Sequence, residues 1–192
     1  MSDIKATGAR TSSAKKKNFH IGGQQLLLLK PPTNWTAPIE LPDLRCCKYV
    51  AVDLETRDEG LSEGKGPGWA TGKGHVCGVV LAWHAGQPRA RYFPVKHPDS
   101  KCFDEDSIKR WFKDHIKAGI RFVFLNAPYD LGWLDQDFGI APPSQIDDAG
   151  CMAYMIDEQR PSYGLDALCR WRGIPGKDEK TLQPHLLEAA AS

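Results

Sequence analysis

The sequence predicts an α/β domain in which a mixed β-sheet is flanked by helices. Short apolar runs typical of strands alternate along the chain with amphipathic stretches typical of helices. The 192 residues, with 41% hydrophobic content and six Trp, suffice for one sizeable core but would leave two independent domains small. We therefore expect one globular unit over residues 48–192, preceded by an edge segment and a tail.

Runs of aromatic and β-branched residues bounded by Gly, Pro and charged residues predict the strands. They cover residues 49–55, 75–84, 89–95 and 121–125, with a short strand around Ile146. The second and third strands are separated by Gly86-Gln87-Pro88, a sequence typical of a tight turn, so they should form a hairpin.

Four helices are predicted from the remaining patterns, over residues 104–117, 128–138, 148–157 and 163–171. Pro128 favours the start of the second of these, because proline fits the first turn of a helix. Asp148 is expected to N-cap the third helix, and Asp166 to have a local role in the fourth.

Three carboxylates stand at the ends of predicted strands. Asp53 and Glu55 close the first strand and, being two residues apart, project to the same face. Asp130 falls in the first turn of the helix that follows strand 121–125. Oxygen ligands in such a group suit a hard divalent cation, so the pattern indicates metal-dependent chemistry.

The two segments that carry these carboxylates resemble motifs of a known family. Asp53-Leu-Glu55 and Asn126-Ala-Pro-Tyr129-Asp130, in this order, are similar to the first and second motifs of the 3′–5′ exonuclease (DEDD) family, which has the ribonuclease H-like fold and edits for DNA polymerases. Gln145–Asp148 and Tyr163–Trp171 resemble helices of the bacteriophage-type family A enzymes. The resemblance runs from about Tyr49 to the end of the chain.

The resemblance implies a catalytic role for the three carboxylates and a fold with a ribonuclease H-like mixed sheet. Asp53 would bridge or anchor two Mg²⁺ or Mn²⁺ ions, Glu55 would hold the water-activating ion, and Asp130 would ligate the outer ion. Such a pair of ions hydrolyses phosphodiesters. The substrate would be DNA with a single-stranded 3′ end, with polymerase domains in the parent chain. Substrate contacts are expected from Leu54, Thr56, Asn126 and Tyr129.

The third motif of that family is not found. Its members carry Tyr-x-x-x-Asp or His-x-x-x-x-Asp, which places both groups on one helix face. After Asp130 neither spacing occurs: Tyr154 is followed four residues later by Glu158, and Tyr163 and Asp166 are three apart. We therefore expect a C-terminally incomplete domain that lacks the fourth carboxylate.

Two further segments have open interpretations. Residues 57–74 contain six glycines but no phosphate-binding motif, and are expected to form a long flexible surface loop; alternatively Lys65, Lys73 or Trp69 would touch the substrate strand. Residues 1–23, with Lys15–Lys17, are expected to be a disordered tail, either merely solvated or a DNA-contacting arm.

Composition sets the remaining expectations. The net charge of +1 gives no global basic signature, so nucleic-acid binding must depend on local groups. The six Cys form no C-x-x-C pair and are expected to be buried thiols. Residues 24–47 should form an edge strand and a linker. The apolar runs are too short to span a membrane, so the protein is expected to be cytoplasmic, with no membrane partner.

Three functions agree with these patterns. The first is a 3′–5′ proofreading exonuclease of a DNA polymerase. The second is a catalytically incomplete remnant that retains a binding or structural role, which the missing third motif favours. The third is an RNA-trimming relative, since the motifs do not distinguish ribose from deoxyribose.

Overall fold

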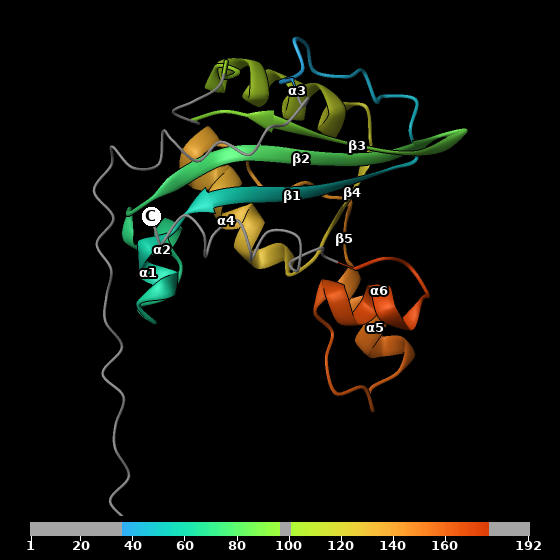
Figure 1. The fold of residues 1–192 in the computed structure, drawn as a ribbon. Helices are drawn as coiled ribbons and strands as arrows, with labels where there is room; N and C mark the ends of the chain where they lie inside the picture. Colours follow the sequence, from blue (N-terminus) through green and yellow to red (C-terminus); the bar gives the residue numbers. More distant parts are fainter. Residues whose placement is uncertain (1–35, 97–100, 177–192) are drawn as a thin grey trace, which may run out of the picture. The chain divides into compact units, whose positions relative to one another are not determined.

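The computed structural model describes residues 36–96 and 101–176, and everything below refers to this part of the chain. Its centre is a five-stranded mixed sheet with the order β3-β2-β1-β4-β5 (Figure 1). The strands are β1 (Tyr49–Arg57), β2 (His75–Ala85), β3 (Gln87–Pro94), β4 (Arg121–Phe124) and β5 (Ile146–Asp148). Strand β2 pairs antiparallel with both β1 and β3, whereas β4 pairs parallel with β1, and β5 pairs parallel with β4.

The predicted strands and hairpin are confirmed. Gly86 forms the turn between β2 and β3 with a φ of 72°, a left-handed conformation that glycine adopts without steric cost. The mixed sheet with flanking helices agrees with the ribonuclease H-like architecture expected from the motifs. The tail of residues 1–23 and residues 24–35 of the expected edge segment lie outside the described residues.

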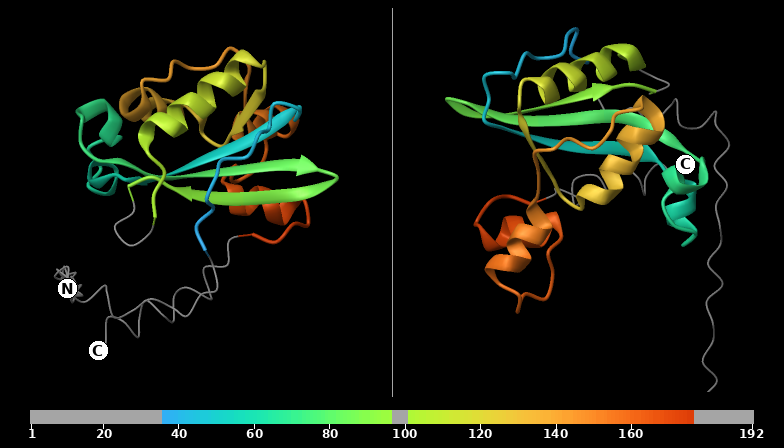
Figure 2. Two further views of the ribbon diagram at one scale, coloured as in Figure 1. Left: turned by 90° about the horizontal axis from the view of Figure 1, so that it is seen from above. Right: turned by 180° about the vertical axis from the view of Figure 1, so that it is seen from behind.

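Six helices accompany the sheet in the described residues. They are α1 (Glu59–Ser62), α2 (Gly68–Thr71), α3 (Glu105–Lys117), α4 (Ala127–Phe138), α5 (Ala149–Ile156) and α6 (Leu165–Trp171). Helix α4 crosses the strands when the sheet is viewed from behind, and α5 and α6 lie beyond β5 (Figure 2). None of these helices is long and apolar enough to cross a membrane.

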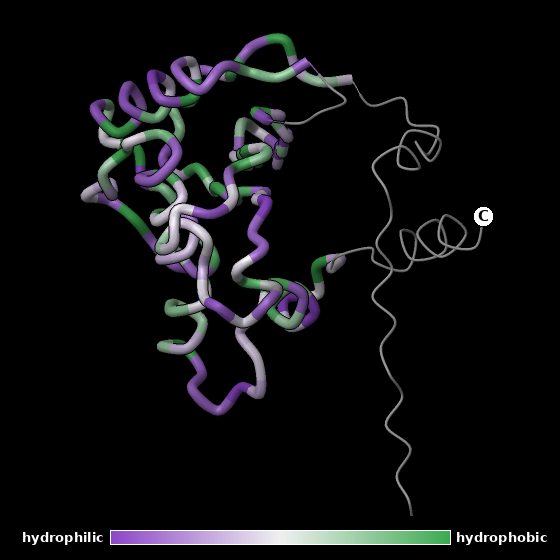
Figure 3. The backbone as a smooth tube through the Cα atoms, turned by 90° about the vertical axis from the view of Figure 1, so that its left-hand side faces the viewer, coloured by the Kyte–Doolittle hydropathy of each residue, from purple (hydrophilic) through white to green (hydrophobic). Residues whose placement is uncertain are grey.

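The core lies between one face of the sheet and helices α3 and α4. Residues along β1 alternate, so that Val50, Val52 and Leu54 are buried while Ala51, Asp53 and Glu55 are exposed. Hydrophobic and hydrophilic residues accordingly alternate over short distances along the backbone (Figure 3). The buried side chains pack against Ile108 and Phe112 of α3 and Trp133 and Leu134 of α4. The sheet therefore has one covered face and one face that carries carboxylates.

Helix α3 is held by its own sequence. The Asp104 carboxylate accepts a hydrogen bond from the Ser107 backbone N–H at 2.8 Å and caps the first turn. Its buried residues Ile108, Trp111, Phe112 and His115 recur with helical spacing on one face. The predicted amphipathic helix is thus confirmed.

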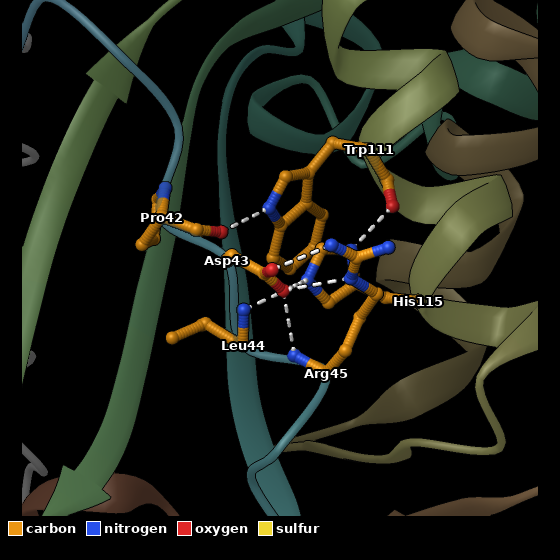
Figure 4. A network of polar contacts seen from close by, with 6 residues as sticks. All are labelled: Pro42, Asp43, Leu44, Arg45, Trp111 and His115. Carbon is orange, nitrogen blue, oxygen red and sulfur yellow. Dashed lines mark hydrogen bonds and ion pairs between the residues drawn. The ribbon is translucent and has the colours of Figure 1, made fainter.

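Residues 36–47 differ from the expected linker, because they pack against α3. The Trp111 indole N–H donates to the Pro42 carbonyl at 2.6 Å, and the Leu44 backbone N–H donates to His115 Nε2 at 3.0 Å (Figure 4). His115 Nδ1 in turn donates to the Trp111 carbonyl at 2.7 Å. Leu44 is buried, so hydrophobic burial and these buried hydrogen bonds fix the segment.

The six Cys form no disulfide, as expected, but none of them is buried. Cys46 and Cys151 are exposed, and the other four are partly exposed. Tertiary packing overrides the apolar sequence context that suggested burial.

His115 gives a prediction about stability and pH. Burial lowers the pKa of His115, because removal from water disfavours the charged ring. The neutral ring also accepts from Leu44 through Nε2, which a ring protonated on both nitrogens cannot do. As the pH falls below 6.5, His115 binds a proton in the unfolded chain more readily than in the folded chain. The free energy of unfolding should therefore fall on acidification, by at most about 1.4 kcal/mol per pH unit from this group.

Denaturant unfolding at a series of pH values measures this effect. His115→Gln, which can still accept a hydrogen bond but does not titrate, should show a weaker pH dependence than the wild type. His84→Gln, an exposed residue of the hairpin, is the matched control. Identical pH profiles for His115→Gln and wild type would contradict the assignment.

Candidate active site

The candidate site lies where β1 and β4 separate. The two strands pair only from Tyr49 to Ala51 of β1, after which β4 ends at Phe124 and the chain enters α4. Beyond this point the backbone of β1 needs another hydrogen-bond partner. The carboxylate of Asp130 supplies it, because Oδ1 accepts from the Leu54 backbone N–H at 3.1 Å. The second sequence motif is thereby fixed onto the first.

The start of α4 is shaped by Asn126 and Asp148. Asn126 has φ 64° and is the one non-glycine residue with positive φ in the described chain, a conformation that Asn tolerates better than most residues. Asp148, at the end of β5, accepts from the Ala127 N–H at 2.6 Å through one oxygen and from the Gly150 and Cys151 N–H groups through the other. One side chain therefore caps α4 and α5 together.

Asp148 was predicted as the N-cap of α5, and this is confirmed; its bond to α4 could not be foreseen from local sequence. Burial alone would raise the pKa of Asp148, but hydrogen bonds from Cys151, Ala127 and Gly150 outweigh burial and lower it. Asp148 is therefore a charged structural group.

Asp130 has the opposite electrostatic character. It is 3% exposed, and burial, followed by repulsion from the charge of Asp53, raises its pKa to about 7. The hydrogen bond from Leu54 opposes this change only in part. The carboxylates of Asp53 and Asp130 are hence close enough to repel each other, and a proton or a cation would relieve the repulsion.

Glu55 lies two residues further along β1, on the exposed face that also carries Asp53. No group of three or more His, Cys, Asp or Glu side chains converges on one point in the described residues. Asp53 and Asp130 thus interact, while the three carboxylates do not form a ready-made cage. Their hard oxygen donors and the repulsion between Asp53 and Asp130 nevertheless fit a divalent cation.

Comparison with known families decides the kind of domain. The sequence model of the 3′–5′ exonuclease domain of family A DNA polymerases matches residues 41–171, more than half of the chain. The chain belongs to this family. The match begins before Tyr49, which agrees with the packing of residues 41–44 against α3.

Individual relatives are more distant. A DNA-directed DNA polymerase of Pseudomonas phage M6 is 28% identical over 166 residues, which make up 81% of this chain and 24% of that polymerase. The chain thus spans about a quarter of the relative. Two structures of Brucella melitensis NrnC, one with bound Mg²⁺ and one bound to pGG, align at a TM-score of 0.47 and 20% identity. They cover 67% of this chain and 56% and 55% of their own chains.

In this exonuclease domain, the predicted substrate residues have different surroundings. Leu54 is 6% exposed and faces the core, so its side chain is unavailable to a ligand. Asn126 lies at the N-cap of α4 without a side-chain capping bond. Thr56 Oγ1 and Tyr129 Oη are 2.9 Å apart, and Tyr129 donates to the Asp58 carboxylate at 3.0 Å. Thr56 and Tyr129 are therefore held in one network.

Asp58 is a residue that the sequence analysis missed. It accepts hydrogen bonds from the backbone N–H groups of Leu61 and Gly68, each at 2.9 Å, as well as from Tyr129. Its position directly before Glu59-Gly60-Leu61 is a helix-start pattern that could have identified it as a cap. Asp58 joins the end of β1, the glycine-rich segment and α4.

The expectation of a flexible loop over residues 57–74 is wrong. This segment contains α1 and α2 and is fastened by Asp58. The Trp69 ring lies directly on Gly132 of α4, where a Cβ would come within 2.4 Å of the indole. Trp69 thus packs against the core, and Lys65 is paired with Glu63 at 2.6 Å.

Trp171, the last residue of α6, lies at the surface. It is 41% exposed, and the guanidinium of Arg160 stacks on its ring 4.0 Å from the centroid. The short helix α6 has no buried residue, so its apolar spacing alone could not establish burial.

Asp130 yields a prediction about stability. Its carboxylate is protonated more easily in the folded than in the unfolded protein, because its pKa rises from 3.8 to about 7. The contribution of Asp130 to the free energy of unfolding is therefore fully present at low pH and is lost as the pH rises to about 7. The loss is at most about 1.4 kcal/mol per pH unit.

Asp130→Asn keeps an oxygen for the Leu54 N–H but carries no charge. We compare the free energies of unfolding of variant and wild type at about pH 5 and about pH 8, in the presence of a chelator. The difference in favour of the variant should be larger at about pH 8. Thermal or denaturant unfolding measures the difference, with Asp135→Asn on the exposed side of α4 as control. If this difference in the free energy of unfolding is the same at both pH values, the charge of Asp130 does not destabilise the folded protein.

Asp58→Ala tests the second network. Removal of an acceptor shared by three donors should destabilise the domain by about 1–3 kcal/mol. Amide hydrogen exchange should accelerate over residues 60–74 in particular, since their backbone loses its anchor. Glu63→Ala removes an exposed ion pair instead and should cost at most about 1 kcal/mol. Unchanged exchange in Asp58→Ala would refute the anchoring role.

Proposed function

We propose that the chain removes nucleotides from the 3′ end of DNA by metal-dependent hydrolysis, at a site formed by Asp53, Glu55 and Asp130. The observation that carries this proposal is the bond from Leu54 N–H to Asp130, which unites the two motif segments. The family match and the phage polymerase relative support DNA as the substrate.

Asp53 and Asp130 would hold the cation between them, and Glu55 would complete the ligand set from the same strand. Bound Mg²⁺ or Mn²⁺ ions would activate water and stabilise charge on the attacking and leaving oxygens. Asp130 must lose its proton to act as a ligand, so its raised pKa makes cation binding compete with protons near neutral pH.

The chain's other residues would position the DNA. Asn126 presents a polar side chain at the start of α4, close in sequence to Asp130. Thr56 lies near the end of β1 and Tyr129 in the first turn of α4, and their shared hydrogen bond orients both hydroxyls. Leu54 contributes through its backbone, because its side chain is in the core.

A second candidate is a nucleic-acid-binding domain with little hydrolytic activity. The observation that favours it is the lack of Tyr-x-x-x-Asp or His-x-x-x-x-Asp after Asp130. A site without a further metal ligand and a group that orients water would hydrolyse DNA more slowly, by a factor of ~10³ or more.

End-labelled single-stranded DNA oligonucleotides, incubated with Mg²⁺ or Mn²⁺, distinguish these candidates. We expect slow trimming from the 3′ end, abolished by Asp53→Asn and retained by Asp135→Asn, with a parallel RNA oligonucleotide reporting sugar preference. Binding without trimming would establish the second candidate. Rapid trimming would show that another carboxylate, such as Asp166, completes the site.

A further inference from the structure

A pocket of about 580 Å³ opens between the start of α4 and helix α5. A cavity of this size is typical of sites for small organic groups. Its lining includes Leu125 and Asn126, which lie directly before α4 and a few residues before Asp130. Leu125 also lines a smaller hollow of about 260 Å³ together with Asp53. The pocket therefore lies beside the surface that carries the candidate carboxylates.

Two tyrosine rings contribute to the wall of this pocket. Tyr154 of α5 and Tyr163, which precedes α6, meet edge to face with ring centroids 5.3 Å apart. The Tyr163 hydroxyl donates to the Asp157 carbonyl at 2.8 Å, so its ring is held in place. Tyr154 is 53% exposed and Met155, which also lines the pocket, is 84% exposed. Large hydrophobic side chains that cluster at the surface in this way mark a binding site.

The polar groups of the pocket suit a ligand that carries no positive charge. Asp148 lines the pocket, but its two oxygens accept from the backbone N–H groups of Ala127, Gly150 and Cys151. Its charge is therefore compensated within the fold. Asn126 is exposed and makes no capping hydrogen bond with its side chain. An amide carries both donors and an acceptor, as the edge of a nucleobase does.

We propose, resting on the function proposed above, that the pocket binds a nucleobase of the single-stranded DNA whose 3′ end reaches Asp53. The base stacks on Tyr154, while Tyr163 supports that ring from the side and Asn126 meets the edge of the base. A strand with its end at Asp53 passes within reach of the pocket, because Leu125 lines both cavities. Every base has an aromatic face, so stacking holds the strand without selecting a sequence.

Fluorescence anisotropy of a labelled single-stranded DNA oligonucleotide, with a chelator present to prevent hydrolysis, is the test. Tyr154→Ala should weaken binding about tenfold or more, whereas Tyr154→Phe, which keeps the ring, should bind like the wild type. Met152→Ala is the matched control, because Met152 is 48% exposed on the same helix but does not line the pocket. Unfolding curves confirm that each variant is folded.

A single abasic nucleotide, moved through the last positions of the oligonucleotide, identifies the bound base. At one position it should weaken binding to the wild type about tenfold, and there Tyr154→Ala should weaken binding no further. Unchanged affinity of Tyr154→Ala for the intact oligonucleotide, or an equal effect of this substitution at every abasic position, overturns the role of the pocket.

Other outcomes separate this proposal from the function on which it rests. If the wild type trims DNA but Tyr154→Ala binds it equally well, only the pocket assignment fails. If the wild type neither binds nor trims the oligonucleotide, the proposed function fails and the pocket assignment fails with it. A dimer in sedimentation velocity that Tyr154→Ala dissociates, with unchanged affinity for DNA, would assign the pocket to a second copy of the chain and overturn the proposal.

Discussion

The hydrogen bond from the Leu54 N–H to the Asp130 carboxylate is the contact on which the site depends. It forms where β4 leaves β1, so a side chain replaces the missing strand as backbone partner. The acceptor is itself buried and stands against the charge of Asp53. The Asp130 carboxylate that accepts this backbone hydrogen bond is therefore in surroundings that favour binding of a proton or a cation.

Carboxylates perform similar structural work elsewhere around this sheet. Asp137, two helical turns after Asp130 on α4, accepts from the Val76 N–H at 2.7 Å at the start of β2. Asp148 caps two helices, and Asp58 holds the glycine-rich segment. Helix α4 is thereby bonded to β1 near its first turn and to β2 near its last. These Asp residues cannot be distinguished by type in the sequence. Their structural roles differ because each accepts from different backbone N–H groups.

The two faces of the sheet carry different kinds of residue. One face buries Val50, Val52 and Leu54 against α3 and α4, and hydrophobic burial of this kind stabilises the fold. The opposite face carries Asp53 and Glu55, with Tyr92 reaching across Gly78. Because side chains alternate along a strand, the Asp-Leu-Glu sequence contributes one core residue and two exposed carboxylates within three residues.

The sequence by itself determined where the strands and the main helices lie along the chain. It also indicated the hairpin and the motif residues Asp53, Glu55 and Asp130. The strands, helices and hairpin follow from periodicity and turn residues, which are local in the chain and depend little on distant partners, whereas the motif residues follow from the resemblance to the exonuclease family. For the same reason the cap Asp148 was predicted from its position directly before a helix.

Only the tertiary structure decided the contacts between distant segments. The Asp130 bond joins residues 76 positions apart, and the Asp58–Tyr129 bond joins residues 71 apart. The packing of Trp69 on Gly132, and of Tyr92 over Gly78, depends on space that no local pattern records. The glycines of residues 57–74 suggested a flexible loop, whereas contacts of Asp58 and Trp69 hold the segment in place. Charge effects such as the raised pKa of Asp130 likewise arise from burial and from neighbours that only folding brings together.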